Sequence, residues 1–314
     1  MQEFSHIPVM LEECMENLAL KDGGIYFDGT VGGGGHSYEI LKRTSPSGRL
    51  IATDLDDEAL AAAKERLSPF NGRFSLYKAN YKDYARVLQA EGVEKLDGAI
   101  LDYGVSSHQI DDEKRGFSYR AKEAPLDMRM DVSASLTAET VVNTYSEERL
   151  YKIIREYGEE KFAKQIAANV VKTRAVKPLK TCGELAQVIE NSIPLKFRFG
   201  APCERKTFQA IRIEVNGELD GLYELVIGLT RRLKTGGRIA ILTFHSLEDR
   251  AVKEAFKFME TPCTCPKNLP VCVCGKKQEI KIITKKPVTA GEEEVKYNSR
   301  SKCAKLRVAE RIAE

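Results

Sequence analysis

An apolar strand, a glycine-rich turn and an amphipathic helix follow one another near the start of the chain. Residues 24–28 are mostly apolar and end in Asp28, residues 32–35 are consecutive glycines, and residues 38–43 have helical spacing. Glycines allow a sharp turn and a close approach of the backbone to a ligand. This succession is typical of the first β–turn–α unit of a nucleotide-binding α/β sheet.

The carboxylate of Asp28 restricts which ligand this turn accepts. A negative charge at the mouth of the turn repels a pyrophosphate, whereas it attracts a ligand with a cationic end. S-adenosylmethionine has such an end, because it carries an ammonium and a sulfonium group. We therefore expect S-adenosylmethionine at this turn. The alternative is a glycine-rich surface turn that binds nothing.

The composition is that of a globular protein with a sizeable core. The chain has 314 residues, 42% hydrophobic and 30% charged, which is enough for one large or two small domains. Its apolar runs are too short to cross a bilayer, and the first residues lack the pattern of a secretory signal. We therefore expect a cytoplasmic protein whose eight cysteines are thiols or metal ligands rather than disulfides.

The first third of the chain alternates between strand and helix patterns. Apolar runs of strand length predict four strands there, at residues 24–28, 49–54, 73–78 and 96–102. Helical spacing is clearest over residues 57–67, and the strand pattern returns at residues 238–244 and 302–310. Apolar strands joined by helices predict a doubly wound α/β sheet with right-handed crossovers.

Residues 112–205 show no strand pattern. Apolar residues recur at helical spacing within this segment, and Thr181 with Glu184 forms a capping box that opens a helix. The sequence therefore predicts an α/β domain made of residues 1–111 and 206–314. A helical insertion, residues 112–205, separates the fourth strand of that domain from the fifth.

Polar side chains follow the predicted strands at their carboxyl ends, where doubly wound sheets bind ligands. Asp54 ends the second strand, about twenty residues beyond the glycines, where an acid accepts hydrogen bonds from ribose hydroxyls. We choose Asp54 over Asp56 because Asp54 closes the apolar run; the alternative is an acid that caps the next helix. Tyr81 follows the third strand, where its ring is placed to lie against an adenine, and Asp102 ends the fourth.

Several short blocks occur in order along nearly the whole chain. They are His6-Ile7-Pro8-Val9-Met10, Asp28-Gly29-Thr30, Gly33-Gly34-Gly35-His36-Ser37, Arg115-Gly116-Phe117-Ser118, Leu126-Asp127-Met128-Arg129-Met130-Asp131, Thr207-Phe208-Gln209-Ala210-Ile211-Arg212-Ile213, Phe244-His245-Ser246-Leu247-Glu248-Asp249-Arg250 and Lys305-Leu306-Arg307. With Asp54, the run from Asp102 to Ser107, and Gln109, these blocks make the chain resemble the bacterial 16S rRNA (cytosine-N4)-methyltransferases, also called RsmH or MraW.

The resemblance implies a Rossmann-like S-adenosylmethionine-dependent methyltransferase sheet with an inserted helical domain. It implies methyl transfer to the exocyclic N4 of a cytosine in the decoding region of 16S rRNA, with the small ribosomal subunit or its RNA as partner. The chain departs from the family pattern at Tyr103 and in residues 202–206. The family's cofactor-binding positions correspond to Gly34, Gly35, His36, Asp54, Tyr81, Asp102 and Gln109, and the charge argument for the turn adds Asp28.

Asp102 is the predicted catalytic residue. Cytosine N4 is a poor nucleophile because its lone pair is delocalised into the ring. An acceptor of hydrogen bonds from the amino group favours a pyramidal nitrogen and receives the charge that develops. Ser106 and Ser107 lie in the same turn as further partners, and either Asp102 or water takes the proton. The alternative is that Asp102 only binds the cofactor.

Aromatic and basic residues of the insertion and its border are expected to face RNA or to stabilise the fold. Single-stranded RNA is read by base stacking and phosphate contacts, after the target base has left its stack. For Tyr103, Phe117 and Tyr119 the alternatives are stacking against bases or packing in a core. For Arg115 and Arg129 the alternatives are phosphate contacts or local ion pairs.

Four cysteines lie in a segment rich in lysine and proline. Cys263, Cys265, Cys272 and Cys274 form two Cys-x-Cys pairs separated by six residues. Thiolates at this spacing are able to bind zinc tetrahedrally, whereas the alternative is free thiols in a loop. Because this spacing is less usual than Cys-x2-Cys and no histidine assists, we expect no metal cofactor and keep structural zinc as the alternative.

Two other functions fit the predicted fold. A nicotinamide-dependent oxidoreductase uses the same β–turn–α unit, but the turn lacks the full Gly-x-Gly-x-x-Gly phasing. A noncatalytic RNA-binding protein would also keep the fold. His245 after the fifth strand either lines the substrate side or forms a structural hydrogen bond with Glu248 or Asp249. The sequence leaves the oligomeric state open, with a homodimer as one alternative.

Overall fold

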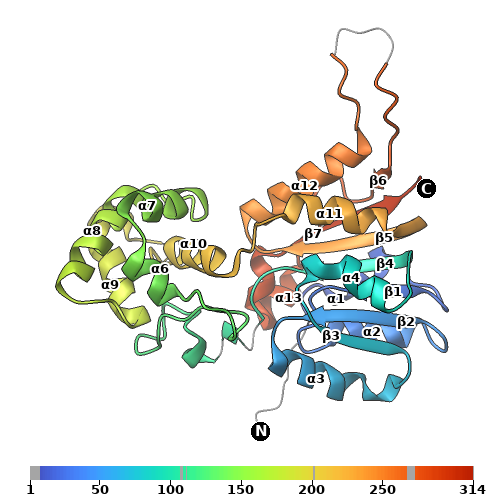
Figure 1. Cartoon of the computed structure of the whole chain (residues 1–314), viewed down its shortest axis with the longest axis horizontal. Helices are drawn as coiled ribbons and strands as arrows, with labels where there is room; N and C mark the ends of the chain where they lie inside the picture. Colours follow the sequence, from blue (N-terminus) through green and yellow to red (C-terminus); the bar gives the residue numbers. More distant parts are fainter. Residues whose placement is uncertain (1–7, 107–108, 111, 201, 267–272, 314) are drawn as a thin grey trace. The chain divides into compact units, whose positions relative to one another are not determined.

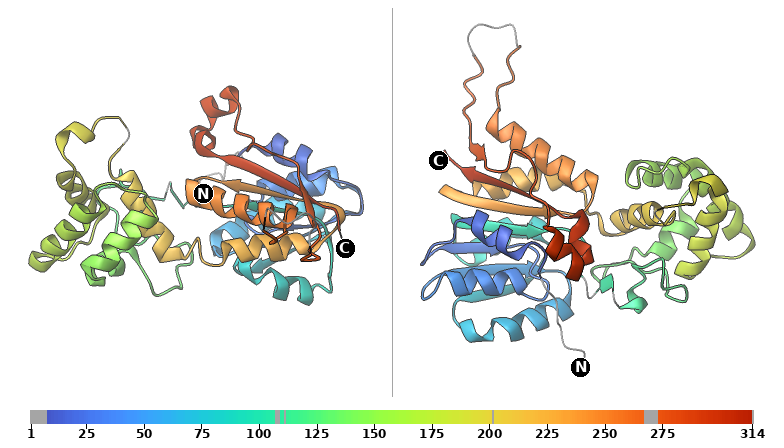
Figure 2. Two further views of the ribbon diagram at one scale, coloured as in Figure 1. Left: turned by 90° about the horizontal axis from the view of Figure 1, so that it is seen from above. Right: turned by 180° about the vertical axis from the view of Figure 1, so that it is seen from behind.

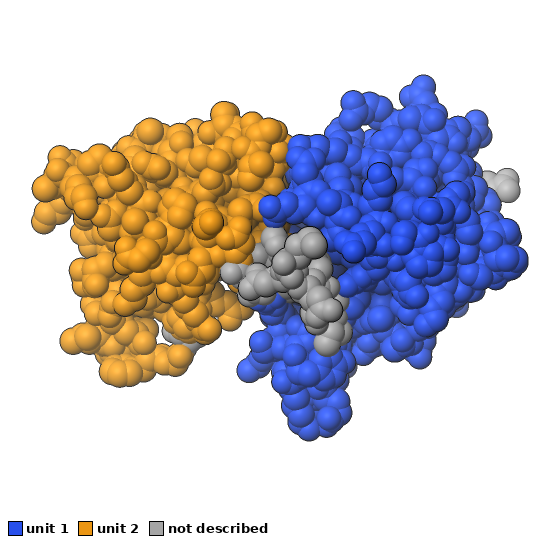
Figure 3. Space-filling model, turned by 90° about the horizontal axis from the view of Figure 1, so that it is seen from below, with its two compact units in different colours: residues 1–104, 221–314 blue, residues 105–220 orange. Residues whose placement is uncertain are grey.

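The computed structural model describes residues 8–106, 109–110, 112–200, 202–266 and 273–313. His6, Ser107 and Cys272, which were named above from the sequence, lie outside the described residues. The chain divides into two compact units, coloured separately in Figure 3. The first unit consists of Met1–Gly104 and Gly221–Glu314, and the second consists of Val105–Asp220.

The first unit is built on one seven-stranded sheet of order β3-β2-β1-β4-β5-β7-β6 (Figure 1). The strands are β1 (Ile25–Asp28), β2 (Arg49–Asp54), β3 (Phe74–Lys78), β4 (Leu96–Asp102), β5 (Leu233–Thr243), β6 (Ile280–Ile282) and β7 (Lys305–Arg311). Neighbours from β3 to β5 are parallel, whereas β7 runs antiparallel to β5 and β6. The predicted doubly wound α/β fold is confirmed.

Helices cover both faces of this sheet (Figures 1 and 2). They are α1 (Leu11–Leu18), α2 (Gly35–Arg43) and α3 (Asp57–Leu67) on one side, and α4 (Tyr84–Ala90), α11 (Leu222–Arg231) and α12 (Ser246–Glu260) on the other. Side chains alternate along each strand, so Leu50 and Ala52 pack with Ile40 and Ala63 while the buried Ile51 faces away from them. Burial on both sides explains the continuous apolar runs of these strands.

The ends of several elements differ from the predictions. Strands β2 and β4 and helix α3 have the predicted bounds, because apolar runs and a capping acid mark them. Strand β5 begins at Leu233, before the predicted 238, since its backbone already pairs with Leu96 and then passes a bulge at the glycines. Strand β7 begins at Lys305 because the preceding residues, Ser299–Cys303, form a 3-10 turn.

The second unit is helical. Its longer helices are α6 (Ala138–Thr144), α7 (Glu147–Glu156), α8 (Ala163–Val176), α9 (Cys182–Ser192) and α10 (Arg205–Asn216). The predicted capping box is present: the Thr181 hydroxyl accepts from the Glu184 N–H at 3.2 Å, and the Glu184 carboxylate accepts from the Thr181 N–H at 3.2 Å. Within its described residues the only β pairing is an isolated bridge between Pro125 and Thr181.

This unit extends beyond the predicted insertion, residues 112–205, at both ends. The reason at the carboxyl end is helix α10, which the sequence pattern had placed in the α/β domain. Its buried residues Phe208 and Ile211 belong to the same core as Ile153 of α7 and Val141 of α6. The carboxyl-terminal boundary of the second unit is therefore decided by the apolar packing of α10, which the pattern of strands along the sequence does not reveal.

No helix among the described residues is long and apolar enough to span a membrane.

Candidate active site

The predicted ligand-binding residues of the first unit gather where strands β1 and β4 end. These two strands are neighbours, and Asp28 of β1 is in register with Ile100 of β4. The N–H of Gly29 donates to the carbonyl of Ile100 at 3.1 Å, so the turn after β1 starts beside the end of β4. From β1 the chain winds outward to β2 and β3 and then returns to β4, which makes this point the switch point of the sheet.

Asp28 lies beneath the turn instead of at an exposed rim. It is 2% exposed, and its carboxylate accepts hydrogen bonds from the Thr30 N–H at 3.0 Å and the Ser37 hydroxyl at 2.7 Å. Burial raises the pKa of Asp28 to about 6, although the bond from Ser37 opposes this shift. Both oxygens therefore hold the strand, the turn and helix α2 together, a role that the sequence alone did not predict.

Two glycines of the turn have backbone conformations that favour glycine. Gly32 has φ of 48° and Gly34 has φ of 77°. The N–H of Gly32 donates to Asp54 at 2.9 Å, and a Cβ on Gly34 would lie 3.2 Å from the Cα of Ala63 in α3. A Cβ on Gly35, which begins α2, would lie 2.2 Å from the Cγ of Pro8. The positive φ therefore favours glycine at positions 32 and 34, and close packing favours it at positions 34 and 35.

Asp54 and Asp56 have different roles at the end of β2. The Asp54 carboxylate accepts from the N–H groups of Gly32 at 2.9 Å and Asp56 at 3.0 Å, and burial raises its pKa. Asp56 is the N-cap of α3 and accepts from the Glu58 N–H at 3.0 Å. Capping is thus the role of Asp56, whereas Asp54 ties the second strand to the glycine turn.

Asp102 is anchored by its backbone and has an unsatisfied carboxylate oxygen. Its N–H donates to the Thr30 hydroxyl at 2.6 Å, while its buried Oδ1 has no hydrogen-bond partner among the described residues. The side chain is 26% exposed. Burial, followed by the charges of Asp28 and Glu248, raises the pKa of Asp102 to about 8. A buried acceptor without a donor is costly unless a ligand supplies one.

His36 faces Asp102 from the first turn of α2. Its Nε2 lies 3.0 Å from the carbonyl of Val9, and because a carbonyl only accepts, Nε2 carries the proton. In the neutral ring Nδ1 is then an acceptor, and it lies 3.9 Å from Oδ2 of Asp102. At 3.9 Å this nitrogen lies near the Asp102 carboxylate but beyond hydrogen-bond length.

Two tyrosines adjoin these acids at the ends of β3 and β4. The ring centroids of Tyr81 and Tyr103 are 5.4 Å apart. Tyr103 is 3% exposed, so it packs in the interior, and burial raises the pKa of its phenol well above the usual value. Tyr81 is half-buried, which leaves part of its ring accessible. Gln109 belongs to the second unit, where its N–H donates to the Ser106 hydroxyl at 3.2 Å.

Residues 3–312 match the sequence model of the MraW methylase family. The chain belongs to this family. A ribosomal RNA small subunit methyltransferase H 2 of Agathobacter rectalis is 54% identical over 310 residues, which cover 98% of this chain and 99% of that protein. Ribosomal RNA small subunit methyltransferases H of Clostridioides difficile and Lachnospira eligens are 51% and 52% identical, each over 99% of this chain and over 100% and 98% of their own lengths. The resemblance found in the sequence is confirmed.

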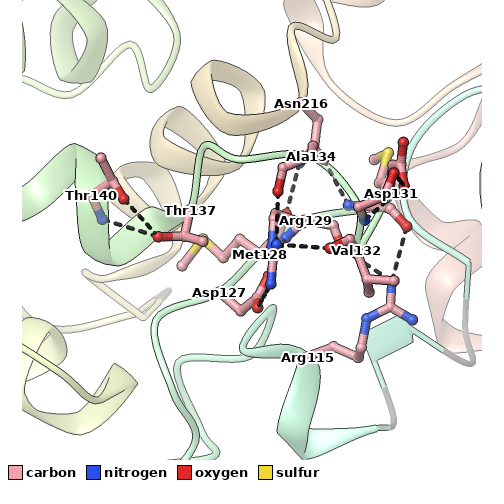
Figure 4. Close-up of polar contacts among 12 residues, drawn as sticks. Arg115, Asp127, Met128, Arg129, Asp131, Val132, Ala134, Thr137, Thr140 and Asn216 are labelled. Carbon is pink, nitrogen blue, oxygen red and sulfur yellow. Dashed lines mark hydrogen bonds and ion pairs between the residues drawn. The ribbon is translucent and has the colours of Figure 1, made fainter.

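In this member of the MraW methylase family, Arg129 forms a local ion pair (Figure 4). Its guanidinium donates to both oxygens of Asp127, at 2.8 and 2.7 Å, and to the carbonyls of Val132 and Ala134. Arg115 donates to the carbonyls of Arg129 and Met130, each at 3.0 Å. Arg129 therefore forms the local ion pair that was one alternative, whereas Arg115 holds the same loop through two backbone carbonyls.

Aromatic residues of the same unit are packed. Phe117 and Tyr119 lie against its hydrophobic core, and the Tyr119 ring meets Phe208 edge-on with centroids 5.8 Å apart. In the first unit, His245 is the N-cap of α12, with Nδ1 accepting from the Glu248 N–H at 3.3 Å. For all three side chains the structure shows the packing or hydrogen-bonding alternative.

Sequence reasoning missed Thr30 and Ser37, which join the predicted residues to each other. Thr30 bonds both Asp28 and Asp102, and Ser37 bonds Asp28 from α2. The pattern Asp28-Gly29-Thr30 is typical of a turn in which the carboxylate accepts the N–H two residues on, so this contact had a sequence signal. The contacts of the Thr30 and Ser37 hydroxyls depend on how β4 and α2 lie in space, and no local pattern marks them.

Proposed function

We propose that this protein transfers the methyl group of S-adenosylmethionine to the exocyclic N4 of a cytosine in the decoding region of 16S rRNA. Membership of the MraW methylase family and relatives named ribosomal RNA small subunit methyltransferase H support this reaction. Because the substrate is ribosomal RNA, we place the reaction in the cytoplasm. The observation that carries the proposal is the buried Oδ1 of Asp102, an acceptor at the switch point that lacks a donor among the described residues.

The residues around the turn fit S-adenosylmethionine. The proposed contacts in the first unit are Gly34, Gly35 and His36 beside the amino-acid end, Asp54 with the ribose hydroxyls, and Tyr81 beside the adenine. Gln109, a residue of the second unit, stays a prediction from the sequence. Asp28 supports this set from beneath, since its carboxylate fixes the turn. Asp54 keeps acceptor capacity, because a carboxylate has about four lone-pair sites and two N–H groups occupy only part of them.

Asp102 acts on the substrate amino group in this proposal. S-adenosylmethionine supplies a methyl group on a positively charged sulfur, and this methyl group is transferred to N4. The carboxylate of Asp102 accepts an N–H of the cytosine, lowers the cost of a pyramidal nitrogen and takes the proton that N4 loses. For this step Asp102 has to be ionised, which a pKa of about 8 opposes in the free protein. The cation that binds beside it lowers that pKa.

We assign RNA binding to the second unit. Lys172, Val176 and Lys177 of α8 and its C-terminal end line a groove together with Val188 and Asn191 of α9. Exposed lysines bind RNA phosphates, and side-chain amides form hydrogen bonds with the bases of single-stranded RNA.

Exposed apolar side chains of the same unit are suited to stacking. Phe199 is 83% exposed and Phe197 is 53% exposed, and the Nζ of Lys196 lies 5.1 Å from the Phe197 ring centroid. Base stacking on such a ring contributes about 1–3 kcal/mol. The variant F199A should therefore raise the KM for RNA roughly tenfold. Its kcat and its thermal unfolding should match those of the wild type, because the ring lies outside the core.

The proposed reaction is tested with small ribosomal subunits that lack the modification. Labelled methyl groups should appear in RNA, and mass spectrometry should place N4-methylcytosine in the decoding region. The variant D54A should abolish transfer, whereas D57N, which alters an exposed carboxylate paired with Lys78, should retain it. Calorimetry with S-adenosylmethionine and with NAD separates the methyltransferase from an oxidoreductase, and binding without transfer to RNA would contradict the proposal.

A further inference from the structure

The segment between α12 and β6 carries chemistry that methyl transfer does not use. This excursion, residues 261–279, runs away from the sheet and returns (Figures 1 and 2). Its base is closed by the Glu279 N–H, which donates to the Met259 carbonyl at 2.9 Å, and by ion pairs of Glu279 with Arg231 and Arg311. These contacts fix the two ends of the excursion, but they do not hold its arms together farther from the sheet.

The described part of the excursion has almost no apolar core. Apart from Pro262, its described residues are exposed or half-buried, and Val273 is 76% exposed. A long loop without regular structure loses much conformational entropy when it is ordered, and burial does not offset that loss here. Small segments of this kind are usually held by a cross-link or a metal ion.

Three cysteine side chains from the two arms lie close together. The sulfur atoms of Cys263 and Cys265 on the outgoing arm and of Cys274 on the returning arm all lie within 4.8 Å of one another. Zinc binds thiolates at about 2.3 Å, so the sulfurs of a tetrahedral site are about 3.8 Å apart. The limit of 4.8 Å on the sulfur–sulfur distances is compatible with this spacing.

The backbone near these sulfurs also fits a metal centre. The N–H of Val273 donates to the sulfur of Cys265 at 3.4 Å, a contact that stabilises a thiolate more than a thiol. Gly275, directly after Cys274, has φ of 66°, so the returning arm turns sharply behind its ligand. Lys276 and Lys277 follow and offset the negative charge that several thiolates bring to one ion.

We propose that Cys263, Cys265 and Cys274 bind a structural zinc ion that joins the two arms of the excursion. On binding, each thiol releases its proton to solvent and its sulfur donates a lone pair to the metal, so no oxidant or reductant is required. Cys272 lies outside the described residues, and its place as fourth ligand remains a prediction from the sequence. The ion has no part in methyl transfer; it orders a lysine-bearing surface segment.

Metal analysis of the purified full-length protein tests this proposal. Reduced protein prepared without chelator should contain about one zinc per chain, and cobalt in its place should give a thiolate-to-metal charge-transfer band. The variants C265S and C274S should bind zinc at least roughly tenfold more weakly. C303S, which changes an exposed cysteine outside the cluster, should keep the metal. Wild-type protein without zinc and without the cobalt band would overturn the site, as would full retention of metal by C265S and C274S.

Limited proteolysis gives a second readout that does not depend on how well the variants fold. Chelation of zinc from the wild type should make trypsin cleavage after Lys276 or Lys277 roughly tenfold faster, since the arms then separate. Thermal unfolding of the α/β unit monitors the rest of the chain in the same samples. Unchanged cleavage after complete removal of the metal, or a disulfide between these cysteines in the purified protein, would contradict a structural role.

Discussion

Two acids end neighbouring strands of the sheet, and their surroundings differ. The carboxylate of Asp28 at the end of β1 accepts two hydrogen bonds from its own turn and from α2. The carboxylate of Asp102 at the end of β4 has a buried oxygen without a partner among the described residues and faces His36 at 3.9 Å. The two residues have the same type and the same position at a strand end. They differ in their hydrogen bonds: a carboxylate whose donors come from the protein stabilises the fold, whereas one with an oxygen lacking a donor is able to bind a ligand.

The largest expected effect is a loss of catalytic activity when Asp102, but not an exposed acid, is substituted. The variant D102N should lower kcat by about 10²- to 10⁴-fold, because the amide neither takes the proton of N4 nor carries the required charge. Its affinity for S-adenosylmethionine should stay within a few-fold, measured by calorimetry. Unchanged turnover with retained cofactor affinity would refute the catalytic role of Asp102, and D57N serves as the matched exposed control.

Substitution of Asp28 should instead lower the stability of the protein. The variant D28A leaves the Thr30 N–H and the Ser37 hydroxyl without their acceptor, so the free energy of unfolding should fall by about 2–3 kcal/mol. D28N keeps a side-chain oxygen for Thr30 and should lose less than half of that amount. Urea denaturation measures both variants. A D28A protein of wild-type stability that lost turnover would place Asp28 on the ligand instead.

The pH dependence of the activity should follow the ionisation of the Asp102 carboxyl group. Its ionised form is the acceptor, and its pKa in the free protein is about 8. Below this pH the ionised fraction, and with it kcat/KM for S-adenosylmethionine, should fall about tenfold per pH unit, while activity rises towards pH 8. The residual activity of D102N should lack this slope. A slope that persists in D102N would assign the titration to another group.

The smallest effect concerns the partner of Asp28. The variant S37A removes one buried hydrogen bond to the Asp28 carboxylate and should lower the free energy of unfolding by about 1 kcal/mol. It should also raise the pKa of Asp28, because this bond favours the ionised form. S47A is the matched control, since Ser47 bonds the exposed Asp22, and its effect should be near zero. Equal effects of S37A and S47A would contradict the role of Asp28 as a buried anchor.

Some parts of the site were within reach of sequence reasoning. Apolar runs marked β2 and β4 and placed Asp54 and Asp102 at their ends, because strand burial leaves a continuous pattern. The preference for Asp54 rested on where the apolar run closes, and the structure gives the helix cap to Asp56. Whether Asp54 binds a ribose is still a prediction.

Other parts depended on contacts between distant segments. Helix α10 has an ordinary amphipathic pattern, so only the core that it packs against assigned it to the second unit. The sequence left Arg129 with two alternatives, and the position of Asp127 beside its guanidinium decided between them. The length of β5 depended on pairing with β4, which no local pattern records.

By itself the sequence determined the family, the alternation of strands and helices in the first third of the chain, and the residues that end β1 to β4, because these follow from local patterns and from blocks of identical residues. Only the tertiary structure decided that Asp28 turns inward, that Asp102 keeps an unsatisfied oxygen, and that three cysteines from two arms meet. The physical reason is that hydrogen-bond satisfaction and burial depend on every segment that surrounds a side chain, whereas a pattern records only its neighbours along the chain.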